Sequence, residues 1–255
     1  MYDLFDLTNK TAIVTGGGTG LGKQMAIALS EAGANVVVCS RKLEACQKTS
    51  EQIKEIGTDS FALKCDITKI EEIQNVINKT KEKFGSIDIL INNSGTSWVA
   101  PFLDTPPDKW DKVMRVNVKG TFLFSQAVGK VMTQQKSGKI INIASVAGIK
   151  GQLASIMNAW PYSTSKGAVI SLTKDLASKL APYNVQVNAI APGLFQTRLT
   201  KDLSNVSEPL LAKIPSRRFG SNEDLKGAAV FLSSNASNYI TGHTLVVDGG
   251  LSETI

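Results

Sequence analysis

A tyrosine and a lysine stand four positions apart in the run Tyr162-Ser163-Thr164-Ser165-Lys166. The apolar residues that follow recur at helical spacing, and residues i and i+4 are neighbours on a helix, so both functional groups can point the same way. A phenol is a poor acid at neutral pH, but a cation about 5 Å away favours the phenolate by roughly 3 kcal/mol, which lowers its pKa by about two. The pair therefore predicts a tyrosine that exchanges a proton with a carbonyl or hydroxyl oxygen. Because the same spacing is common on helix surfaces, the rest of the chain must supply the other parts of a site.

The elements that would position such a pair begin near the amino terminus. Residues 11–14 form an apolar strand, a glycine-rich stretch from Thr15 to Gly22 follows directly, and residues 25–32 have a helical spacing that Gly33 ends. Strand, glycine loop and helix in this order are the context that a dinucleotide-binding loop requires. Glycine allows positive φ and lets main-chain N–H groups approach a pyrophosphate at the helix N-terminus.

The second predicted strand, residues 35–39, ends in Ser40-Arg41-Lys42. An acidic residue at this point would bind the ribose 2′-hydroxyl of NAD, whereas the guanidinium of Arg41 suits the 2′-phosphate of NADP. This contrast favours NADP(H) over NAD(H), although a solvated surface arginine would look the same in sequence.

Strands and helices alternate through the rest of the chain. The further predicted strands are residues 60–65, 87–91, 139–143, 185–190 and 244–247. Two of the intervening helices begin with capping boxes, Thr68 with Glu71 and Ser221 with Asp224. The alternation predicts an α/β fold of the Rossmann type, doubly wound, in which a seven-stranded parallel sheet carries helices on both faces. We expect a single domain that spans residues 1–255.

The polar and glycine residues of interest fall where the predicted strands end. In strand order they are the glycine loop, Arg41, Asp66, Asn93 with Gly95, Ser145, and Pro192 with Gly193. Ligands of open α/β sheets bind beyond the carboxyl ends of the strands, so this agreement predicts a site at that edge of the sheet. Tyr162 enters on the next helix, close to Ser145.

The composition is that of an ordinary globular protein, with 255 residues of which 42% are hydrophobic and 20% charged. The net charge of +6 is spread among acidic residues. An anionic small ligand explains this charge, and a nucleic-acid surface is possible but not indicated. Three cysteines without a C-x-x-C pair predict reduced, buried thiols in the cytoplasm, and a lone His243 argues against a metal site. The amino terminus lacks the apolar stretch of a signal peptide, and no apolar run has the length of a membrane span.

Taken together, these motifs resemble the short-chain dehydrogenase/reductase family across essentially the whole chain. The matching segments are Thr15-Gly16-x-x-x-Gly20-x-Gly22, Asn92-Asn93-Ser94-Gly95, Asn117, Ser145, Tyr162-x-x-x-Lys166 and Pro192-Gly193-x-x-x-Thr197. Ser94 stands where the family more often has alanine. Thr19 stands where some NADP-using members have a basic residue, so the NADP(H) prediction rests mainly on Arg41.

The resemblance implies catalytic roles for four residues. Tyr162 would be the general acid in reduction and the base in oxidation, and Lys166 would lower its pKa and bind the nicotinamide ribose. Ser145 would donate a hydrogen bond to the substrate oxygen, where negative charge develops. Asn117 would hold a helix kink and a water that links Lys166 to solvent. A strand-end serine bonded to the main chain and a buried asparagine are simpler explanations of Ser145 and Asn117.

The resemblance also implies how the cofactor is bound. The expected contacts are Gly16, Gly18, Thr19, Gly20, Leu21, Ser40, Arg41, Asp66, Ile67, Asn93, Gly95, Tyr162, Lys166, Gly193, Phe195 and Thr197. Among these, Asp66 and Ile67 would meet the adenine, and the segment from Gly193 to Thr197 would hold the nicotinamide carboxamide. Ordinary turns remain the simpler explanation of Asp66 and of Pro192-Gly193.

These roles imply an NADP(H)-dependent oxidoreductase that interconverts a secondary alcohol and a ketone. The opening Leu4-Phe5-Asp6-Leu7-Thr8 and the glycine loop are similar to gluconate 5-dehydrogenase-like members, which favours a sugar acid such as 5-ketogluconate as substrate. The length and motif set are equally similar to 3-oxoacyl thioester reductases. A cofactor-binding regulator without turnover is the alternative of another class, which the intact Tyr162–Lys166 pair disfavours.

The family also implies a homotetramer, in which the helices that contain Asn117 and Tyr162 form one interface and the C-terminal strand forms another. The segment between Ser145 and Tyr162 is longer than usual for the family, with the extra residues around 153–160, including Met157, Asn158 and Trp160. Loops at this edge of a sheet carry specificity, so we expect this segment to contact substrate rather than to be a surface extension only.

Overall fold

In a computed structural model of the protein, which describes residues 2–151, 158–195, 208 and 211–253, the described strands form one parallel sheet. Its order is β3-β2-β1-β4-β5-β6-β7, so the predicted seven-stranded parallel sheet is confirmed. The strands are β1 (Thr11–Thr15), β2 (Asn35–Ser40), β3 (Ser60–Lys64), β4 (Ile89–Asn92), β5 (Gly138–Ile143), β6 (Val185–Pro192) and β7 (Thr244–Val247). The strand order reverses between β1 and β4, which is the switch point where sheets of this kind bind ligands.

Helices connect these strands. The described α-helices are α1 (Gly20–Glu31), α2 (Leu43–Ile56), α3 (Ile70–Phe84), α4 (Pro107–Met114), α5 (Thr121–Gln135), α6 (Trp160–Leu180) and α8 (Lys226–Ser233). Short helical turns add η1 (Tyr2–Leu4), η2 (Phe102–Asp104), the π-helical turn η3 (Arg115–Gly120), η4 (Val146–Gly148), η5 (Ala181–Tyr183) and η7 (Asn235–Ser237).

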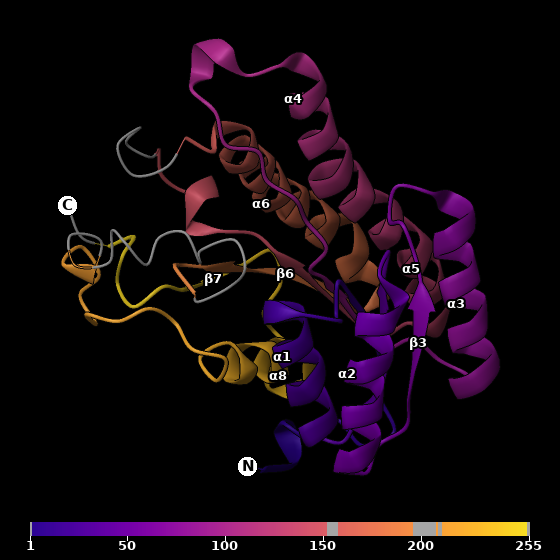
Figure 1. Cartoon of the computed structure of the whole chain (residues 1–255). Helices are drawn as coiled ribbons and strands as arrows, with labels where there is room; N and C mark the ends of the chain where they lie inside the picture. Colours follow the sequence, from indigo (N-terminus) through magenta and orange to yellow (C-terminus); the bar gives the residue numbers. More distant parts are fainter. Residues whose placement is uncertain (1, 152–157, 196–207, 209–210, 254–255) are drawn as a thin grey trace.

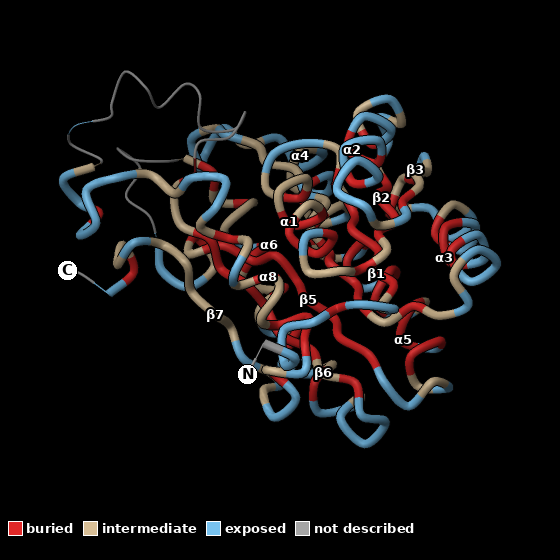
Figure 2. The backbone as a smooth tube through the Cα atoms, turned by 90° about the horizontal axis from the view of Figure 1, so that it is seen from below, coloured by how far each residue is buried: buried red, intermediate tan, exposed pale blue. Residues whose placement is uncertain are grey.

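The helices cover both faces of the sheet (Figure 1). On one face α1, α2 and α8 pack on strand residues such as Val36 and Val38. On the other face α3, α5 and α6 pack on the alternate residues, such as Val37 and Cys39. Successive strand residues point to opposite faces, so strands covered on both sides need nearly continuous apolar runs. Figure 2 shows the result, with buried backbone through the sheet and exposed backbone on the outer turns.

Helix ends confirm one prediction and correct another. Gly33, the predicted end of the first helix, follows α1 with φ of +101°, and Gly57 follows α2 in the same way with φ of +114°, in the left-handed region that glycine permits. The predicted capping box of Thr68 and Glu71 is wrong. Instead Asp66 accepts hydrogen bonds from the main-chain N and the hydroxyl of Thr68 (3.0 and 2.8 Å). The threonine side chain is therefore bonded within the turn before α3 and does not cap the helix.

The other predicted capping box forms but lies outside its helix. The main-chain N of Ser221 donates to Asp224 Oδ2 (2.6 Å), and the main-chain N of Glu223 donates to Ser221 Oγ (3.3 Å). Because α8 begins only at Lys226, these bonds close the turn that precedes the helix. Arg218 also bonds both carboxylate oxygens of Asp224 (2.6 and 2.8 Å), which draws this carboxylate toward the preceding segment.

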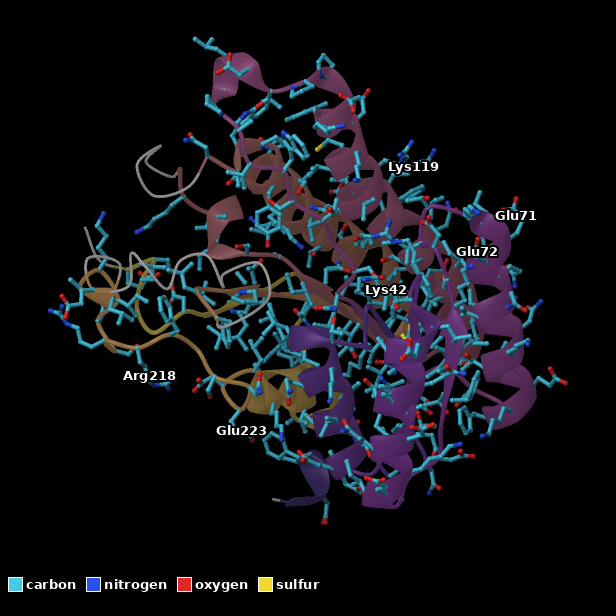
Figure 3. All side chains as sticks on the ribbon, in the orientation of Figure 1. Lys42, Glu71, Glu72, Lys119, Arg218 and Glu223 are labelled. Atoms are coloured by element: carbon cyan, nitrogen blue, oxygen red, sulfur yellow. The ribbon has the colours of Figure 1, made fainter. Side chains whose placement is uncertain are left out.

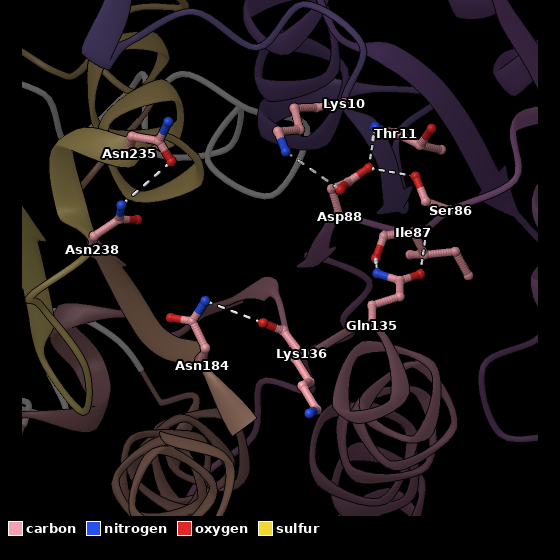
Figure 4. Close-up of polar contacts among 10 residues, drawn as sticks. All are labelled: Lys10, Thr11, Ser86, Ile87, Asp88, Gln135, Lys136, Asn184, Asn235 and Asn238. Carbon is pink, nitrogen blue, oxygen red and sulfur yellow. Dashed lines mark hydrogen bonds and ion pairs between the residues drawn. The ribbon is translucent and has the colours of Figure 1, made fainter. Parts of the chain in front are cut away.

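Polar contacts close the amino-terminal ends of the central strands (Figure 4). Asp88 Oδ2 accepts from the main-chain N of Thr11 (2.9 Å) and from the hydroxyl of Ser86 (2.8 Å). Gln135 bonds both main-chain groups of Ile87, at 2.9 and 3.1 Å. These contacts satisfy loop groups at the end of the sheet opposite the predicted site.

Charged side chains of both signs project from the outer helix faces and turns, and Figure 3 labels Lys42, Glu71, Glu72, Lys119, Arg218 and Glu223. Within the described ranges no helix has both the length and the apolar character to cross a membrane, and no cluster of three metal-ligating side chains occurs. All three cysteines are buried free thiols.

Candidate active site

Three of the predicted catalytic side chains meet at the end of β5. Ser145 follows β5, and its hydroxyl forms a hydrogen bond with the phenol of Tyr162 in the first turn of α6. One turn further along α6, the Lys166 ammonium lies 5.5 Å from the centroid of the Tyr162 ring and donates to the main-chain O of Ile143 (2.5 Å). The phenol, the serine hydroxyl and the ammonium therefore face one side of the helix.

A close contact between η4 and α6 brings these groups together. Ser145 caps η4, because its Oγ accepts from the main-chain N of Ala147 (3.2 Å). A Cβ at Gly148 would lie 2.5 Å from main-chain atoms of Lys166 and Gly167. Only glycine allows this approach. Gly148 was not among the predicted site residues, and its signal is a glycine three positions after a strand-end serine.

Burial changes the proton affinities of the pair in a direction that the spacing alone does not predict. Burial raises the pKa of the Tyr162 phenol, and the hydrogen bond with Ser145 offsets this only in part. Burial also lowers the pKa of Lys166 to about 8. The net change in the phenol pKa is therefore opposite to the lowering that the Tyr162–Lys166 spacing predicts, because burial is its largest cause.

Asn117 lies in the π-helical turn between α4 and α5, an irregularity of the kind that kinks helices. Its side chain is 1% exposed, accepts from the main-chain N of Thr96 (2.8 Å) and donates to the main-chain O of Thr96 (2.9 Å) and to Ser165 Oγ (2.8 Å). Ser165 in turn donates to the main-chain O of Tyr162 (2.7 Å). Asn117 thus ties the segment after β4 to the helical turn of the tyrosine. Ser165, which no prediction singled out, is the link.

A buried polar network lies beneath these residues. Asn92 Nδ2 donates to Asn142 Oδ1 (2.9 Å) and to Ser125 Oγ (2.8 Å), and Asn142 Nδ2 donates to Thr173 Oγ1 (3.0 Å). The network joins β4 and β5 to α5 and α6, and its partnered groups offset the cost of burial. Asn142 was also missed, and the signal for it is a polar residue inside an otherwise apolar strand.

The glycine loop lies against the end of β4. Gly16 has φ of +67°, and Asn93 Nδ2 donates to the main-chain O of Thr15 (3.0 Å) and of Gly16 (3.3 Å). Thr19 is the N-cap residue of α1, but its side chain makes no capping hydrogen bond. Gly20 has φ of +55° and no atom within 4 Å of the place where a Cβ would lie. An open, left-handed glycine at a helix N-terminus fits a pyrophosphate, so these residues fit a nicotinamide dinucleotide.

The predicted adenosine contacts lie at the ends of the neighbouring strands β2 and β3. Ser40 ends β2, and the exposed Arg41 follows it. Burial raises the pKa of Asp66, but hydrogen bonds from Thr68 and nearby charges that include Arg41 outweigh burial and lower it. Asp66 is thus a turn residue in this structure and also lies within electrostatic reach of Arg41. Ile67 is 6% exposed.

The remaining predicted cofactor residues lie at the same edge. Gly18 and Leu21 lie in the glycine loop and the first turn of α1, and Gly95 follows β4. Gly193 donates its main-chain N to Val247 O (3.0 Å), and the buried Phe195 forms an isolated bridge with Gly220. Thr197 and residues 153–157 of the predicted extra segment lie outside the described residues.

Aromatic side chains meet at the start of α6, close in sequence to Tyr162. Trp160, two residues before Tyr162, stacks on Trp110 with ring centroids 5.1 Å apart and meets Phe102 edge-on at 5.0 Å. The main-chain N of Ala100 donates to Asn158 O (3.0 Å). The segment after β4 therefore lies beside the residues that lead into α6.

Comparison with known proteins yields one family model and many relatives. The model described as enoyl-(acyl carrier protein) reductase matches residues 16–252. The chain is 38% identical over 254 residues to the 5-keto-D-gluconate 5-reductase of Escherichia coli (strain K12), covering 98% of this chain and 98% of that protein. It is 40% identical over 248 residues to the NAD-dependent glycerol dehydrogenase of Listeria innocua serovar 6a, covering 96% of this chain and 95% of that protein.

A solved structure is similarly close. The crystal structure of a gluconate 5-dehydrogenase from Burkholderia cenocepacia J2315 in complex with NADP and tartrate has a TM-score of 0.94 and 36% identity. The match covers 100% of this chain and 99% of that chain.

Proposed function

The chain belongs to the short-chain dehydrogenase/reductase family and is an NAD(P)-dependent oxidoreductase that acts on CH–OH groups, and we propose that it interconverts a secondary alcohol and a ketone with Tyr162 as general acid and base. The observation that carries this proposal is the meeting of Tyr162, Ser145 and Lys166 at the end of β5. We further propose that residues 1–255 form one domain that both binds the dinucleotide and performs the reaction.

Each of the three side chains has its own role in ketone reduction. When bound, NADPH supplies the hydride. Tyr162 donates the proton to the substrate oxygen, and its phenol is protonated at neutral pH, which is the form that a general acid needs. Ser145 donates its hydroxyl hydrogen to the same oxygen as negative charge develops there. Lys166, with its pKa lowered to about 8, can return a proton to the phenol near neutral pH.

Replacement of the phenol tests the catalytic role. Tyr162→Phe keeps the ring and removes the proton donor, so kcat should fall roughly 100-fold to 10,000-fold while the Kd for NADPH stays nearly unchanged. Tyr183→Phe is the matched control, because Tyr183 is 49% exposed beyond the other end of α6. Undiminished turnover by Tyr162→Phe would reject the role. Binding of NADPH by the wild type without turnover of any ketone would instead support a regulator.

We also propose that NADP(H) is preferred over NAD(H). The support is the exposed Arg41 directly after β2, the absence of an acidic residue in Ser40-Arg41-Lys42, and the NADP in the related gluconate 5-dehydrogenase structure. The relative from Listeria innocua, which is NAD-dependent, supports the opposite preference. A charge-assisted bond to the 2′-phosphate is worth about 1.5–3 kcal/mol, or roughly 10-fold to 100-fold in affinity.

Arg41→Ala should therefore reduce kcat/KM for NADPH by roughly 10-fold to 100-fold and leave kcat/KM for NADH nearly unchanged. Lys42→Ala, which removes the adjacent exposed cation, is the control and should change neither value by more than about twofold. A wild-type enzyme with a higher kcat/KM for NADH than for NADPH would contradict the proposal.

For the substrate, we propose a sugar acid such as 5-ketogluconate. The names of the Escherichia coli and Burkholderia cenocepacia relatives support this class. A 3-oxoacyl thioester is the second candidate, and the acyl carrier protein in the description of the family model favours it. NADPH oxidation with 5-ketogluconate, acetoacetyl thioesters and neutral ketones separates the candidates by kcat/KM.

A homotetramer in the cytoplasm is the final part of the proposal. An apolar groove of about 520 Å³ supports one interface between copies of the chain, and it is lined by Met114, Arg115, Val118, Lys119, Phe122 and Leu172. The three buried free thiols support a reducing compartment. The mass in solution tests the assembly. Phe122→Glu, which adds a charge to the groove, should dissociate the interface, and a wild-type monomer would contradict the proposal.

A further inference from the structure

All three tryptophans of the chain, Trp98, Trp110 and Trp160, lie in two segments, the chain after β4 and the start of α6. We define the aromatic lobe as Phe102, Trp110 and Trp160, whose rings are in direct contact. Two of its members come from the chain after β4, and the third is the first residue of α6. The lobe therefore joins two segments that are distant in sequence.

Trp160 is at the centre of this lobe. Its ring stacks on Trp110 at an interplanar angle of 25° and meets Phe102 at 61°. Its indole Nε1 donates to Thr105 Oγ1 (2.9 Å). Each of these partners lies in the segment from η2 to α4, so one side chain makes three separate contacts with the chain after β4.

The first turn of α6 depends on such contacts because it has no side-chain cap. Ala159 occupies the N-cap position and supplies no hydrogen-bond acceptor from its side chain. Helix ends without a capping side chain leave N–H groups of the first turn unsatisfied and are the parts of helices that open most easily. This turn carries Tyr162.

Tyr162 lies between two anchors. On its C-terminal side, Ser165 is bound by Asn117 and Lys166 is bound by Ile143 O. On its N-terminal side, the neighbouring contacts are those of Trp160 with the lobe and the main-chain bond from Ala100 to Asn158. Loss of the Trp160 contacts would leave the tyrosine turn held firmly from one side only.

We infer that Trp160 is a positioning residue for Tyr162, which fixes the first turn of α6 against the chain after β4 so that the phenol stays beside Ser145. The inference rests on the proposed catalytic role of Tyr162. A displacement of about 1 Å in a reacting group can reduce turnover roughly 100-fold, so a loosened first turn should be visible in kcat.

The test compares Trp160→Ala with Trp160→Phe. Trp160→Ala should lower kcat roughly 30-fold to 100-fold and leave the Kd for NADPH within about twofold of the wild type. Trp160→Phe keeps a ring between Phe102 and Trp110 and should restore kcat to within about fivefold of the wild type. Tyr183→Ala, beyond the other end of α6, is the control for removal of an aromatic ring and should leave kcat unchanged.

Amide hydrogen exchange reads the same effect without turnover. In Trp160→Ala the peptide of residues 160–166 should exchange faster, because the Ser163 N–H bond to Ala159 O (3.0 Å) opens more often, while β5 and the end of α6 keep their protection. Phe102→Ala removes a ring that is 67% exposed and should give a smaller increase in the exchange rate of the same peptide. This milder variant provides the test if Trp160→Ala does not fold.

Wild-type kcat in Trp160→Ala, or equal exchange in residues 160–166, would overturn the inference. A uniform loss of protection across the sheet would also overturn it, because that result indicates general packing. If the wild type reduces no ketone, the proposed function fails, and local exchange still decides whether Trp160 fixes this turn.

Discussion

The edge of the sheet where the strands end has two halves that are held in different ways. In the nucleotide half, which is the glycine loop with Asn93 and which we propose to hold the nucleotide, glycines pack tightly against main-chain carbonyls and the Asn93 side chain. A Cβ at Gly22 would overlap the Asn93 amide and the main-chain O of Gly16. In the substrate half, which is residues 96–110 and 158–162 and which we propose to face the substrate, large side chains meet instead, with Trp160 in contact with both Phe102 and Trp110.

This difference indicates which amino-acid substitutions each half tolerates. Main-chain contact requires glycine at fixed positions, so the nucleotide half keeps one shape whichever alcohol reacts. Contact between side chains can be changed ring by ring while the sheet stays the same, and loops at this edge are where specificity varies. The following substitutions test the contrast, from the largest expected effect to the smallest.

Gly22→Ala should be the most damaging change. The added Cβ meets the main-chain O of Gly16, which cannot recede, and the Asn93 side-chain amide that is bonded to the glycine loop. Overpacking of this kind costs about 3 kcal/mol at the upper end of its usual range. The free energy of unfolding in urea should fall by that amount, and the Kd for NADPH should rise. Gly227→Ala is the matched control, because Gly227 is also helical but has nothing within 4 Å of its Cβ position. It should be neutral or stabilising by up to about 1 kcal/mol. Equal stabilities of the two variants would remove the steric argument.

Asn117→Ala should have the next largest effect. It removes three buried hydrogen bonds to Thr96 and Ser165, and water entering the space replaces part of the loss, so we expect about 2 kcal/mol in the free energy of unfolding. The value of kcat should fall as well, because Ser165 bonds to Tyr162 O. Asn78→Ala is the control, since Asn78 is exposed on α3 and accepts one bond from Gln74. A kcat equal to that of the control would show that this link does not reach the tyrosine.

The nucleotide half could be predicted from sequence because its signals are local. The glycine spacing, the apolar run before it and the helical pattern after it lie within residues 11–33. Strand ends follow from apolar runs, and parallel strands end at one edge, so the neighbourhood of Arg41, Asn93 and Ser145 was also predictable. The predicted capping of α3 by Thr68 is wrong because the Thr68 hydroxyl donates to Asp66 instead, and whether that bond forms depends on the geometry of the turn.

The substrate half could not be predicted in the same way because its contacts join distant segments. The spacing of Tyr162 and Lys166 is local, but the carbonyl that binds the ammonium belongs to Ile143, 23 positions away. Burial of the pair, which also depends on distant segments, decides the direction of both pKa changes. The partners of Trp160 lie about 50 residues earlier in the chain, and no periodic pattern in either segment indicates which rings will meet.

A buried cation at the other end of β5 provides a pH test of stability. Lys139 is 8% exposed, and its ammonium donates to Ser237 Oγ (3.3 Å) and Asn238 Oδ1 (2.8 Å). Burial lowers its pKa to about 8. Between that value and the unfolded value near 10.4, the unfolded chain binds more protons, so the native state gains stability as pH rises.

The free energy of unfolding of the wild type, relative to Lys139→Met, should therefore rise by about 1 kcal/mol between pH 7.5 and 9.5. Lys166→Met removes the other buried lysine and should show the same direction, because its pKa is also lowered to about 8. Unfolding in urea at several pH values measures both differences. A difference that stays constant with pH would mean that Lys139 keeps its proton throughout this range.

Thr105→Val should have the smallest effect and sharpens the role of the rings. The threonine hydroxyl accepts from Trp160 Nε1 (2.9 Å) and donates to Pro101 O (3.0 Å). Because the side chain is only half-buried, water can replace these bonds, and the free energy of unfolding should fall by about 0.5 kcal/mol with kcat within about twofold of the wild type. Tryptophan emission measures the local change, since all three tryptophans lie in or beside this segment. If Thr105→Val instead lowered kcat as much as Trp160→Ala, the indole N–H bond rather than the ring contacts would stabilise the substrate half. The two halves would then differ in their hydrogen bonds and not in their packing.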